Sequence, residues 1–301
     1  MFVVTYRKFF YGLSALLLLA SIAAVIVWGF NLGIDFKGGS IIEVEYSQAR
    51  PAQADLLAKL TPLDFKESIR STGEKGYIIR MRTVDQNEKV SLDTALKSFG
   101  EYNEVRFDSI GPVLGSEALR KSLVSIILVI LAIVLFIAYA FRQVSEPVSS
   151  WKYGLIAIAA LVHDVIIPTG VFVVLGHFLG YEIDTLFITA LLVVLGFSVH
   201  DTIVVFDRVR ENLKHATAKK PFDQIVGESI SQTFTRSINT SLTTLLALIV
   251  LYFVGGASTH HFSLALIIGI VAGTYSSIFI GSPLLVTMWK WQENKRQKGK
   301  K

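Results

Sequence analysis

The chain has 301 residues, of which 52% are hydrophobic and only 18% are charged, and it contains no cysteine. The charged share lies below the level of about a quarter that soluble domains usually have, and the mean hydropathy is +0.53. The lack of cysteine excludes disulfides, thiolate catalysis and cysteine-based metal sites. The net charge of +5 is typical of the positive-inside bias of membrane proteins. No basic patch is interleaved with exposed aromatic residues, so nucleic acid is not expected as a partner.

The apolar residues gather in six long runs. A helix of about 20 apolar residues crosses a bilayer core about 30 Å thick, and backbone groups in lipid must bond internally, so each run is predicted to be a transmembrane helix. The runs are 9–30, 121–141, 153–175, 185–206, 232–254 and 262–289. The first is too long for the apolar region of a typical signal peptide, and no clear cleavage site follows, so we expect a retained helix. The last five form a predicted transmembrane domain at 119–290, followed by a basic tail at 291–301.

Lysine and arginine gather on one side of the predicted membrane. Arg7 and Lys8 precede the first run, and further basic residues crowd the segment 207–229 and the C-terminal tail. Neither short loop on the opposite side, 177–184 or 255–261, contains a lysine or an arginine. By the positive-inside rule, both termini are predicted to be cytoplasmic. The segment 207–229 is predicted to be a loop whose amphipathic stretches lie at the membrane surface.

The segment 31–118, between the first two runs, is predicted to face outside, since it contains charges of both signs and no spanning run. Its patterns predict strands and helices in the order β-α-β-β-α-β, which is that of a ferredoxin-like fold. The predicted elements lie at 41–46, 51–60, 64–71, 76–83, 88–99 and 102–110. We therefore expect a polytopic α-helical membrane protein with six transmembrane helices and a small extracytoplasmic α+β domain between helices 1 and 2.

Ionisable side chains inside the predicted spans are the leading functional candidates, because they are costly in lipid. They are His163 and Asp164 in the third span, His200 and Asp201 in the fourth, and Arg236 in the fifth. Polar residues at three- and four-residue spacing are predicted to line one face of the fifth span. These are Gln232, Arg236, Asn239, Thr240 and Thr243, and on the fourth span Ser198, Asp201 and Thr202 cluster likewise. Two facing polar stripes would enclose a narrow wet path.

Protonation is the chemistry that this pattern offers. Burial favours the neutral carboxyl and a nearby guanidinium favours the carboxylate, so a change in the separation of Asp201 and Arg236 would drive proton uptake or release. One charge moved through 100 mV corresponds to about 2.3 kcal/mol, enough to shift a conformational equilibrium more than tenfold. The alternative is a static ion pair that only joins helices. His163 and Asp164 are interpreted as an interhelical contact, with a relay or orienting role as the alternative, and His200 stays open between a titratable group and a simple polar contact.

Two other patterns bear on packing and on enzymatic function. Gly269, Gly273, Ser277 and Gly281 recur every four residues, which predicts a ridge of small residues where another helix approaches closely. Gly196-Phe-Ser198-Val-His200 lacks the final glycine of a nucleophile elbow, no Walker motif is present, and His260-His261 is too little for a metal site. We therefore expect no enzymatic activity, no cofactor and no bound metal.

Several long motifs resemble those of a known family. The segment Gly33-Ile-Asp35-Phe36-Lys37-Gly38-Gly39 follows the first run and is similar to the Asp-Phe-x-Gly-Gly motif of the SecD and SecF proteins. The segments 196–212, 236–244 and 269–283 resemble the fourth, fifth and sixth spans of the SecF branch, and 161–164 also fits. The resemblance covers nearly the whole chain and places it in the resistance-nodulation-division superfamily. His200 departs from the pattern, which commonly has asparagine there, and this puts the local hydrogen bonding in question.

The resemblance implies a subunit of the Sec protein-export machinery in the bacterial cytoplasmic membrane. Members pair with SecD, associate with the SecYEG channel and often with YajC, and use a proton or sodium gradient to complete preprotein translocation after the SecA motor. The resemblance assigns ion coupling to Asp201 and Arg236, with His200, His163, Asp164, Ser198, Asn239 and Thr240 as supporting candidates. The outer domain is expected to bind or guide the emerging chain together with that of SecD.

Two other functions compete with this interpretation. One is a half-unit of a small-molecule or lipid exporter of the same superfamily, and the other is a purely structural membrane scaffold. The long motifs and the small outer domain argue against the exporter. The polar stripes argue, more weakly, against the scaffold.

Overall fold

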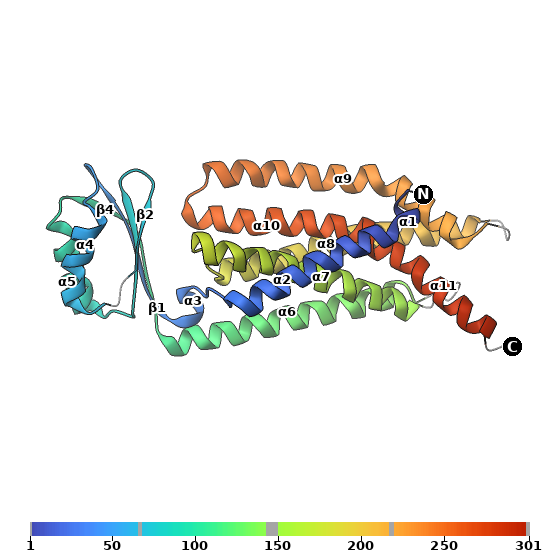
Figure 1. The fold of residues 1–301 in the computed structure, drawn as a ribbon, viewed down its shortest axis with the longest axis horizontal. Coiled ribbons are helices and arrows are strands. Elements are labelled where there is room, and N and C mark those ends of the chain that lie inside the picture. Colours follow the sequence, from blue (N-terminus) through green and yellow to red (C-terminus); the bar gives the residue numbers. More distant parts are fainter. Residues whose placement is uncertain (1, 66–67, 143–149, 217–219, 299–301) are drawn as a thin grey trace. The chain divides into compact units, whose positions relative to one another are not determined.

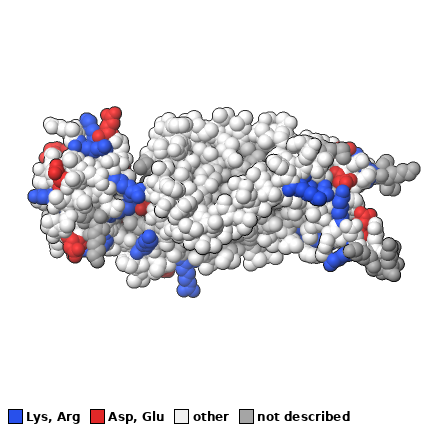
Figure 2. Space-filling view, in the orientation of Figure 1, with Lys and Arg blue, Asp and Glu red and all other residues white. Residues whose placement is uncertain are grey.

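The computed structural model describes residues 2–65, 68–142, 150–216 and 220–298 (Figure 1). The chain divides into two compact units, Met1–Asn31 with Val124–Lys301, and Leu32–Leu123. Six helical segments of the described chain are long and apolar enough to cross a membrane, which confirms the predicted number of spans. On the face shown in Figure 2, the charged side chains of the helical unit gather toward the end where both chain termini lie, and its middle is uncharged.

The spanning helices begin or end beyond the apolar runs that predicted them. They are α2 (Arg7–Trp28), α6 (Pro112–Ala140), α7 (Ser150–Leu179), α8 (Thr185–His215), α9 (Phe222–Val254) and α10 (Ala257–Ser276). The sixth span continues from α10 through a π-helical segment (Ser277–Gly281) into α11 (Ser282–Lys298), and a short helix α1 (Phe2–Thr5) precedes α2. Because an apolar run marks only the length that lipid can cover, it underestimates a helix whose polar ends continue into water.

The segment 207–229 differs from its prediction as a loop with separate surface stretches. α8 continues to His215 and α9 already begins at Phe222, while residues 217–219 lie outside the described part of the chain. Val209 and Val226 are fully buried in the main apolar cluster of the helical unit. The apolar residues that gave this segment its amphipathic pattern therefore pack helix against helix.

The outer unit contains one antiparallel sheet of four strands in the order β2-β3-β1-β4. The strands are β1 (Gly39–Tyr46), β2 (Ser68–Thr72), β3 (Gly76–Met81) and β4 (Tyr102–Ile110). Helices α4 (Gln53–Leu60) and α5 (Gln86–Lys97) cover one face of the sheet (Figure 1), and a helical turn α3 (Ile34–Lys37) precedes β1. This order confirms the predicted ferredoxin-like α+β domain.

Alternation along the strands builds the core of the outer unit. Ile42 of β1 is fully buried and lies between Ile79 of β3 and Phe107 of β4. Leu92 of α5 is fully buried in the same apolar cluster. At the start of α5, the Asp85 carboxylate accepts a hydrogen bond from the Glu88 amide at 2.9 Å, and the Glu88 carboxylate accepts one from the Asp85 amide at 2.9 Å. This reciprocal cap explains why the helix begins at that point.

The ridge of small residues packs within the chain. A Cβ atom at Gly269 would lie 2.3 Å from the Val194 side chain, and one at Gly273 would lie 3.0 Å from the Ser198 Cβ. Only a glycine at these positions lets α10 approach α8 this closely. The predicted ridge therefore has its partner in the helix that carries Asp201.

Candidate functional site

Asp201 lies on α8 at a buried position, with 7% of its surface exposed. The Ser237 hydroxyl on α9 donates a hydrogen bond to Asp201 Oδ1. The second carboxyl oxygen, Oδ2, is also buried and has no hydrogen-bond partner among the described residues. One oxygen of a membrane-embedded carboxyl is thus free to take a proton or to meet a partner.

Arg236 precedes Ser237 on α9 but points elsewhere. Adjacent residues on a helix are turned by about 100°, so Ser237 is buried against α8 while Arg236 is exposed. Among the described residues, Arg236 makes no hydrogen bond and no ion pair with Asp201. Its side chain helps to line a cavity of about 280 Å³. The structure therefore places the two predicted ion-coupling residues on neighbouring helices without joining them.

The cavity beside Arg236 is a polar groove between α8 and α9. Arg208 donates to Gln232 Oε1 at 2.6 Å and to Glu211 at 2.6 Å, and Asn212 donates to the same Gln232 oxygen at 2.9 Å. Its lining is Val204, Asp207, Arg208, Glu211, Gln232, Thr233 and Arg236. The lining contains two cationic and two anionic side chains, so water and polar groups can bind near Arg236.

The polar stripe predicted on the fifth span lies outside the buried contact with α8, although Gln232 accepts hydrogen bonds from Arg208 and Asn212 of α8 at the groove. Gln232, Arg236, Asn239, Thr240 and Thr243 are all exposed in this chain. A different stripe, with a period of four residues, faces inward and consists of Ser229, Thr233, Ser237 and Ser241. Ser241 bonds Thr274 of α10 at 2.6 Å. The regular serine and threonine spacing was the signal in the sequence that could have identified this inner face, and with it Ser237.

A second buried cluster is centred on Asp164 of α7, which is fully buried. His163 Nδ1 donates to Asp164 Oδ1 at 2.9 Å. The hydroxyls of Ser198 on α8 and Ser276 on α10 donate to Asp164 Oδ2 at 2.5 and 2.8 Å. Asp164 thus joins α7 to α8 and α10, as predicted for the aspartate, whereas the hydrogen bond of His163 stays within α7. His200 is exposed and lies outside both clusters.

The two clusters are connected along α8 and the π-helical segment. Thr202, next to Asp201, bonds the Ser277 hydroxyl at 2.7 Å. The Ser277 hydroxyl in turn donates to the Ser198 carbonyl at 3.1 Å, and the Ser282 hydroxyl donates to the Ser277 carbonyl at 3.0 Å. π-Helical turns are rare and occur frequently at functional sites. The residues on either side of Asp201 are therefore held by the one irregular turn of the sixth span.

The motif after the first span has a structural role in the outer unit. Phe36 is buried, and Gly38 and Gly39 have φ angles of +77° and +129°, which favour glycine. A Cβ at Gly39 would lie 2.8 Å from the Met81 carbonyl oxygen. The two glycines shape the backbone between α3 and β1. Asp35 lies in α3, and all four motif residues lie in the other compact unit from Asp201.

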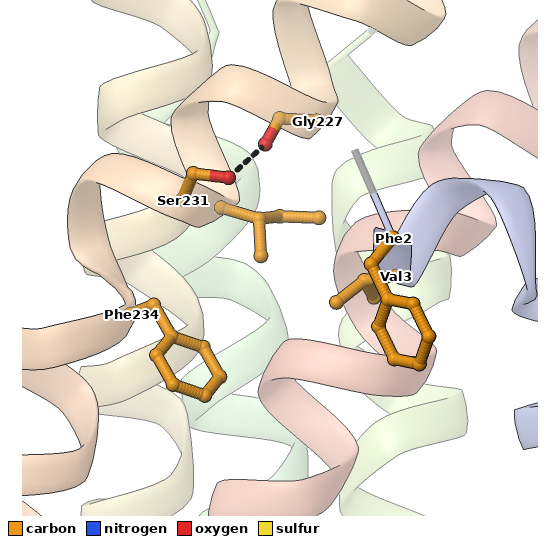
Figure 3. Close-up of a pocket in the computed structure, with 6 residues that line it drawn as sticks. Phe2, Val3, Gly227, Ser231 and Phe234 are labelled. Carbon is orange, nitrogen blue, oxygen red and sulfur yellow. Dashed lines mark hydrogen bonds between the residues drawn. The ribbon is translucent and has the colours of Figure 1, made fainter.

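A further cavity, of about 260 Å³, lies between α1 and the beginning of α9 (Figure 3). Its lining is mostly apolar and includes Phe2, Val3, Ile230 and Phe234. The Ser231 hydroxyl that also lines it already donates to the Gly227 carbonyl at 3.0 Å (Figure 3). This cavity has no side chain suited to ion binding and is not part of the candidate site.

Two family models and several known proteins match this chain. Residues 91–291 match the model of the family "Protein export membrane protein SecD/SecF, C-terminal", and residues 26–49 match "SecD/SecF GG Motif". The chain is 44% identical over 299 residues to "Protein translocase subunit SecF" of Thermobaculum terrenum, covering 95% of this chain and 93% of that protein. It is 35% identical to the protein of the same name from Sebaldella termitidis, covering 98% and 94%.

Solved structures give the same result for the fold. The crystal structure of SecDF, a translocon-associated membrane protein from Thermus thermophilus, is similar with a TM-score of 0.82 and 31% identity over 95% of this chain. SecDF in its super-membrane-facing form has a TM-score of 0.68 and 30% identity over 99% of this chain. The chain spans 38% and 40% of the length of these two SecDF chains.

Proposed function

The chain belongs to the SecD/SecF family of protein-export membrane proteins, in its SecF branch, and from that premise we propose that it couples an ion gradient to preprotein translocation through Asp201. The gradient is one of protons or of sodium ions, and SecD is the other subunit of the ion-coupled complex. The observation that carries the proposal is the open, buried Oδ2 of Asp201, whose carboxyl accepts a hydrogen bond from only one described side chain.

The physical argument rests on the state of this carboxyl. A buried charge that lacks partners is costly, so Asp201 can be ionised only when a cation or further donors approach it. One charge moved through 100 mV is worth about 2.3 kcal/mol. A conformation in which a positive group reaches Asp201 and one in which it does not would therefore be populated differently as the ion gradient loads the site.

Arg236 is the proposed positive group. It lies in the polar groove beside α8, one residue from the hydroxyl that bonds Asp201. A modest change at the α8–α9 contact would alter its distance from the carboxyl. His163, Asp164 and Ser198 support the site by holding α8 to its neighbours, whereas Asn239 and Thr240 belong to the outer stripe of α9.

The outer stripe of α9 supports the pairing with SecD. Polar side chains exposed along a spanning helix are costly in lipid, and Gln232, Arg236, Asn239 and Thr243 are all exposed in this chain. A partner subunit that covers them would remove that cost. The similarity to SecDF, a longer chain of which this chain spans 38%, supports SecD as this partner.

The remaining parts of the proposal concern location and other partners. We place the chain in the bacterial cytoplasmic membrane with lipid around its apolar faces and both termini in the cytoplasm. Lys and Arg precede the first span and crowd the segment 207–229 and the C-terminal tail, whereas the short loops 177–184 and 255–261 contain none. SecYEG, with YajC where present, is the proposed channel partner. The outer domain would meet the translocating preprotein. The chain itself would act as a transport component with no enzymatic activity, cofactor or resident metal.

The test is preprotein translocation into vesicles that contain this chain with SecD and SecYEG. Asp201→Asn keeps an acceptor for Ser237 but cannot ionise, and Arg236→Met removes the charge with little change of length. Each is expected to abolish the part of translocation that depends on the gradient, while the complex still assembles. Glu293→Gln, at an exposed position on α11 outside the groove, is the control for a lost carboxylate. Normal gradient-dependent translocation by both variants would refute the coupling role.

A further inference from the structure

Helix α6 is buried at one position near each end, and between them Val129, Ile130 and Ile133 pack, partly buried, against the core of the helical unit. Among the described residues of α6, only Gly115 and Ile137 are buried. The side chains between these two positions are exposed or half-buried in this chain, including Leu128, Leu131 and Leu135. The 23 residues from Gly115 to Ile137 form about 33 Å of continuous helix. A helix held in this way can transmit a displacement from one end to the other.

The first anchor is a contact between two backbones in the outer unit, which we call the glycine clasp and which consists of Gly38 and Gly115. A Cβ at Gly115 would lie 2.8 Å from the Gly38 amide nitrogen and 3.0 Å from the Phe36 carbonyl oxygen. A Cβ at Gly38 would lie 2.7 Å from the Pro112 Cα, and its φ of +77° also favours glycine. Because the opposing atoms belong to the backbone, no side chain can move aside to admit a methyl group.

The second anchor is a cluster of three aromatic rings at the other end of the helix. Phe141 continues the last turn of α6, since its amide donates to the Ile137 carbonyl at 3.0 Å. Its ring stacks on Tyr153 of α7 at 5.3 Å and meets Phe206 of α8 edge-on at 6.0 Å, and Tyr153 and Phe206 are 5.2 Å apart. All three side chains are almost completely buried. Phe206 lies on the same helix as Asp201, little more than one turn away.

We propose that α6 is the mechanical connection between the ion-coupling helix α8 and the outer domain. The inference rests on the proposed function of Asp201. A displacement of α8 moves Phe206, and the packed rings pass it to Phe141 and the end of α6. The helix carries it as a rigid body, and the glycine clasp passes it to the turn before β1. Gly38, Gly115, Phe141, Tyr153 and Phe206 are positioning residues for coupling, and none of them touches the ion.

The connection from α2 is much shorter. Asn31 is fixed in the helical unit, since its carbonyl accepts from the Ile183 amide at 2.8 Å and its side chain donates to the Tyr181 carbonyl at 2.9 Å. Only Leu32 and Gly33 lie between Asn31 and α3. This connection is a short piece of non-helical backbone, whereas α6 enters both units as a single helix.

The experiment separates ion movement from its mechanical output in vesicles containing the complete complex. Because the chain has no cysteine, one cysteine introduced at exposed Val90 can carry a fluorophore that reports on the outer domain, with cysteine-free partners. Gly115→Ala is compared with Gly111→Ala, where a Cβ would meet no atom within 4 Å. Phe141→Leu is compared with Phe136→Leu, whose ring is exposed on the same helix.

Gly115→Ala and Phe141→Leu are expected to retain proton uptake that Asp201→Asn abolishes, but to lose both the gradient-dependent fluorescence change and gradient-dependent translocation. The two control variants should behave like the unchanged chain. The inference would be overturned if Gly115→Ala and Phe141→Leu retained both the gradient-dependent fluorescence change and gradient-dependent translocation. Loss of proton uptake in these variants would also overturn it, because their effect would then lie at the ion site. If Gly115→Ala fails to assemble, the comparison of Phe141→Leu with Phe136→Leu tests the inference. Gradient-dependent translocation by Asp201→Asn would instead refute the proposed function.

Discussion

Replacement of Asp164 by alanine is expected to destabilise the helix bundle strongly, whereas replacement by asparagine is not. The carboxylate accepts hydrogen bonds from Ser198 on α8 and Ser276 on α10, and a third from His163 beside it on α7. Alanine removes every acceptor and leaves buried donors without partners. An asparagine side chain of the same shape can accept both serine hydroxyls on its oxygen. Its amide group can donate to His163 Nδ1, provided that the imidazole adopts the other tautomer.

The expected size follows from the number of bonds. Interhelical hydrogen bonds in a membrane protein contribute about 0.6 kcal/mol on average and about 1.7 kcal/mol at most. The two interhelical bonds, from Ser198 and Ser276, therefore correspond to about 1–3 kcal/mol for Asp164→Ala. At about 2–4 °C per kcal/mol for a chain of this order of size, the midpoint of thermal unfolding should fall by about 2–12 °C. Asp164→Asn should cost less than about 1 kcal/mol, because hydrogen-bond partners are exchanged and none is lost.

Thermal unfolding of the purified variants in one detergent measures this difference, with tryptophan fluorescence as the signal. Glu211→Ala, at an exposed position on α8, is the control for a lost surface carboxylate. The reasoning fails if Asp164→Ala unfolds at the same temperature as the unchanged chain. It also fails if asparagine is as damaging as alanine, because the charge and not the hydrogen bonding would then hold the three helices together.

Three further changes test other parts of the structure. The Arg82 guanidinium holds the pKa of Glu88 at about 2, below its ordinary value. The ion pair should therefore stabilise the outer unit fully above about pH 4.5 and lose its effect as the pH falls toward 2. Glu88→Gln should remove that part of the acid dependence, measured by hydrogen exchange of β1. Leu92→Ala, at a fully buried position, should destabilise the outer unit by about 2–5 kcal/mol, whereas Val90→Ala at an exposed position should change stability by less than about 0.5 kcal/mol, both followed by the same exchange. Gly269→Val would force α10 from α8 and should lower the unfolding temperature in detergent, and an unchanged temperature would show that the two helices need no such close approach.

The sequence contained enough information for the fold because two strong periodicities divide the chain. Long apolar runs indicated six spans, and alternation with turn residues indicated the β-α-β-β-α-β unit. The helix ends were the weak point. At Asp207–Ser229, apolar residues at helical spacing fitted equally well a helix lying on lipid and a helix packed on its neighbour. The second arrangement is the one observed, because Val209 and Val226 are covered by neighbouring helices.

The candidate site was only partly predictable for a similar reason. A polar residue in a span signals a partner, but it does not say on which side of the helix that partner lies. Two polar stripes run side by side on α9, and the prediction used the one that contains the charged Arg236. The uncharged stripe of serine and threonine, which contains Ser237, faces Asp201. The partners of Asp164 were also hidden, since Ser198 and Ser276 are distant in sequence and are brought together by glycine-lined packing of α10 on α8.

The arrangement of these two stripes bears on why the chain works with a second subunit. In this chain, Asp201 meets one hydroxyl and lies apart from Arg236, and the described residues bring it no cation as an ion-pair partner. A buried carboxyl with so few partners gains little from being charged. Arg236 lies on the exposed stripe, where a neighbouring subunit can change its surroundings as well as the α8–α9 contact that sets its distance from the carboxyl. Under the proposed function, the response of Asp201 to an ion gradient would therefore be a property of the assembled complex, and a partner that covers α9 would decide when the site can ionise.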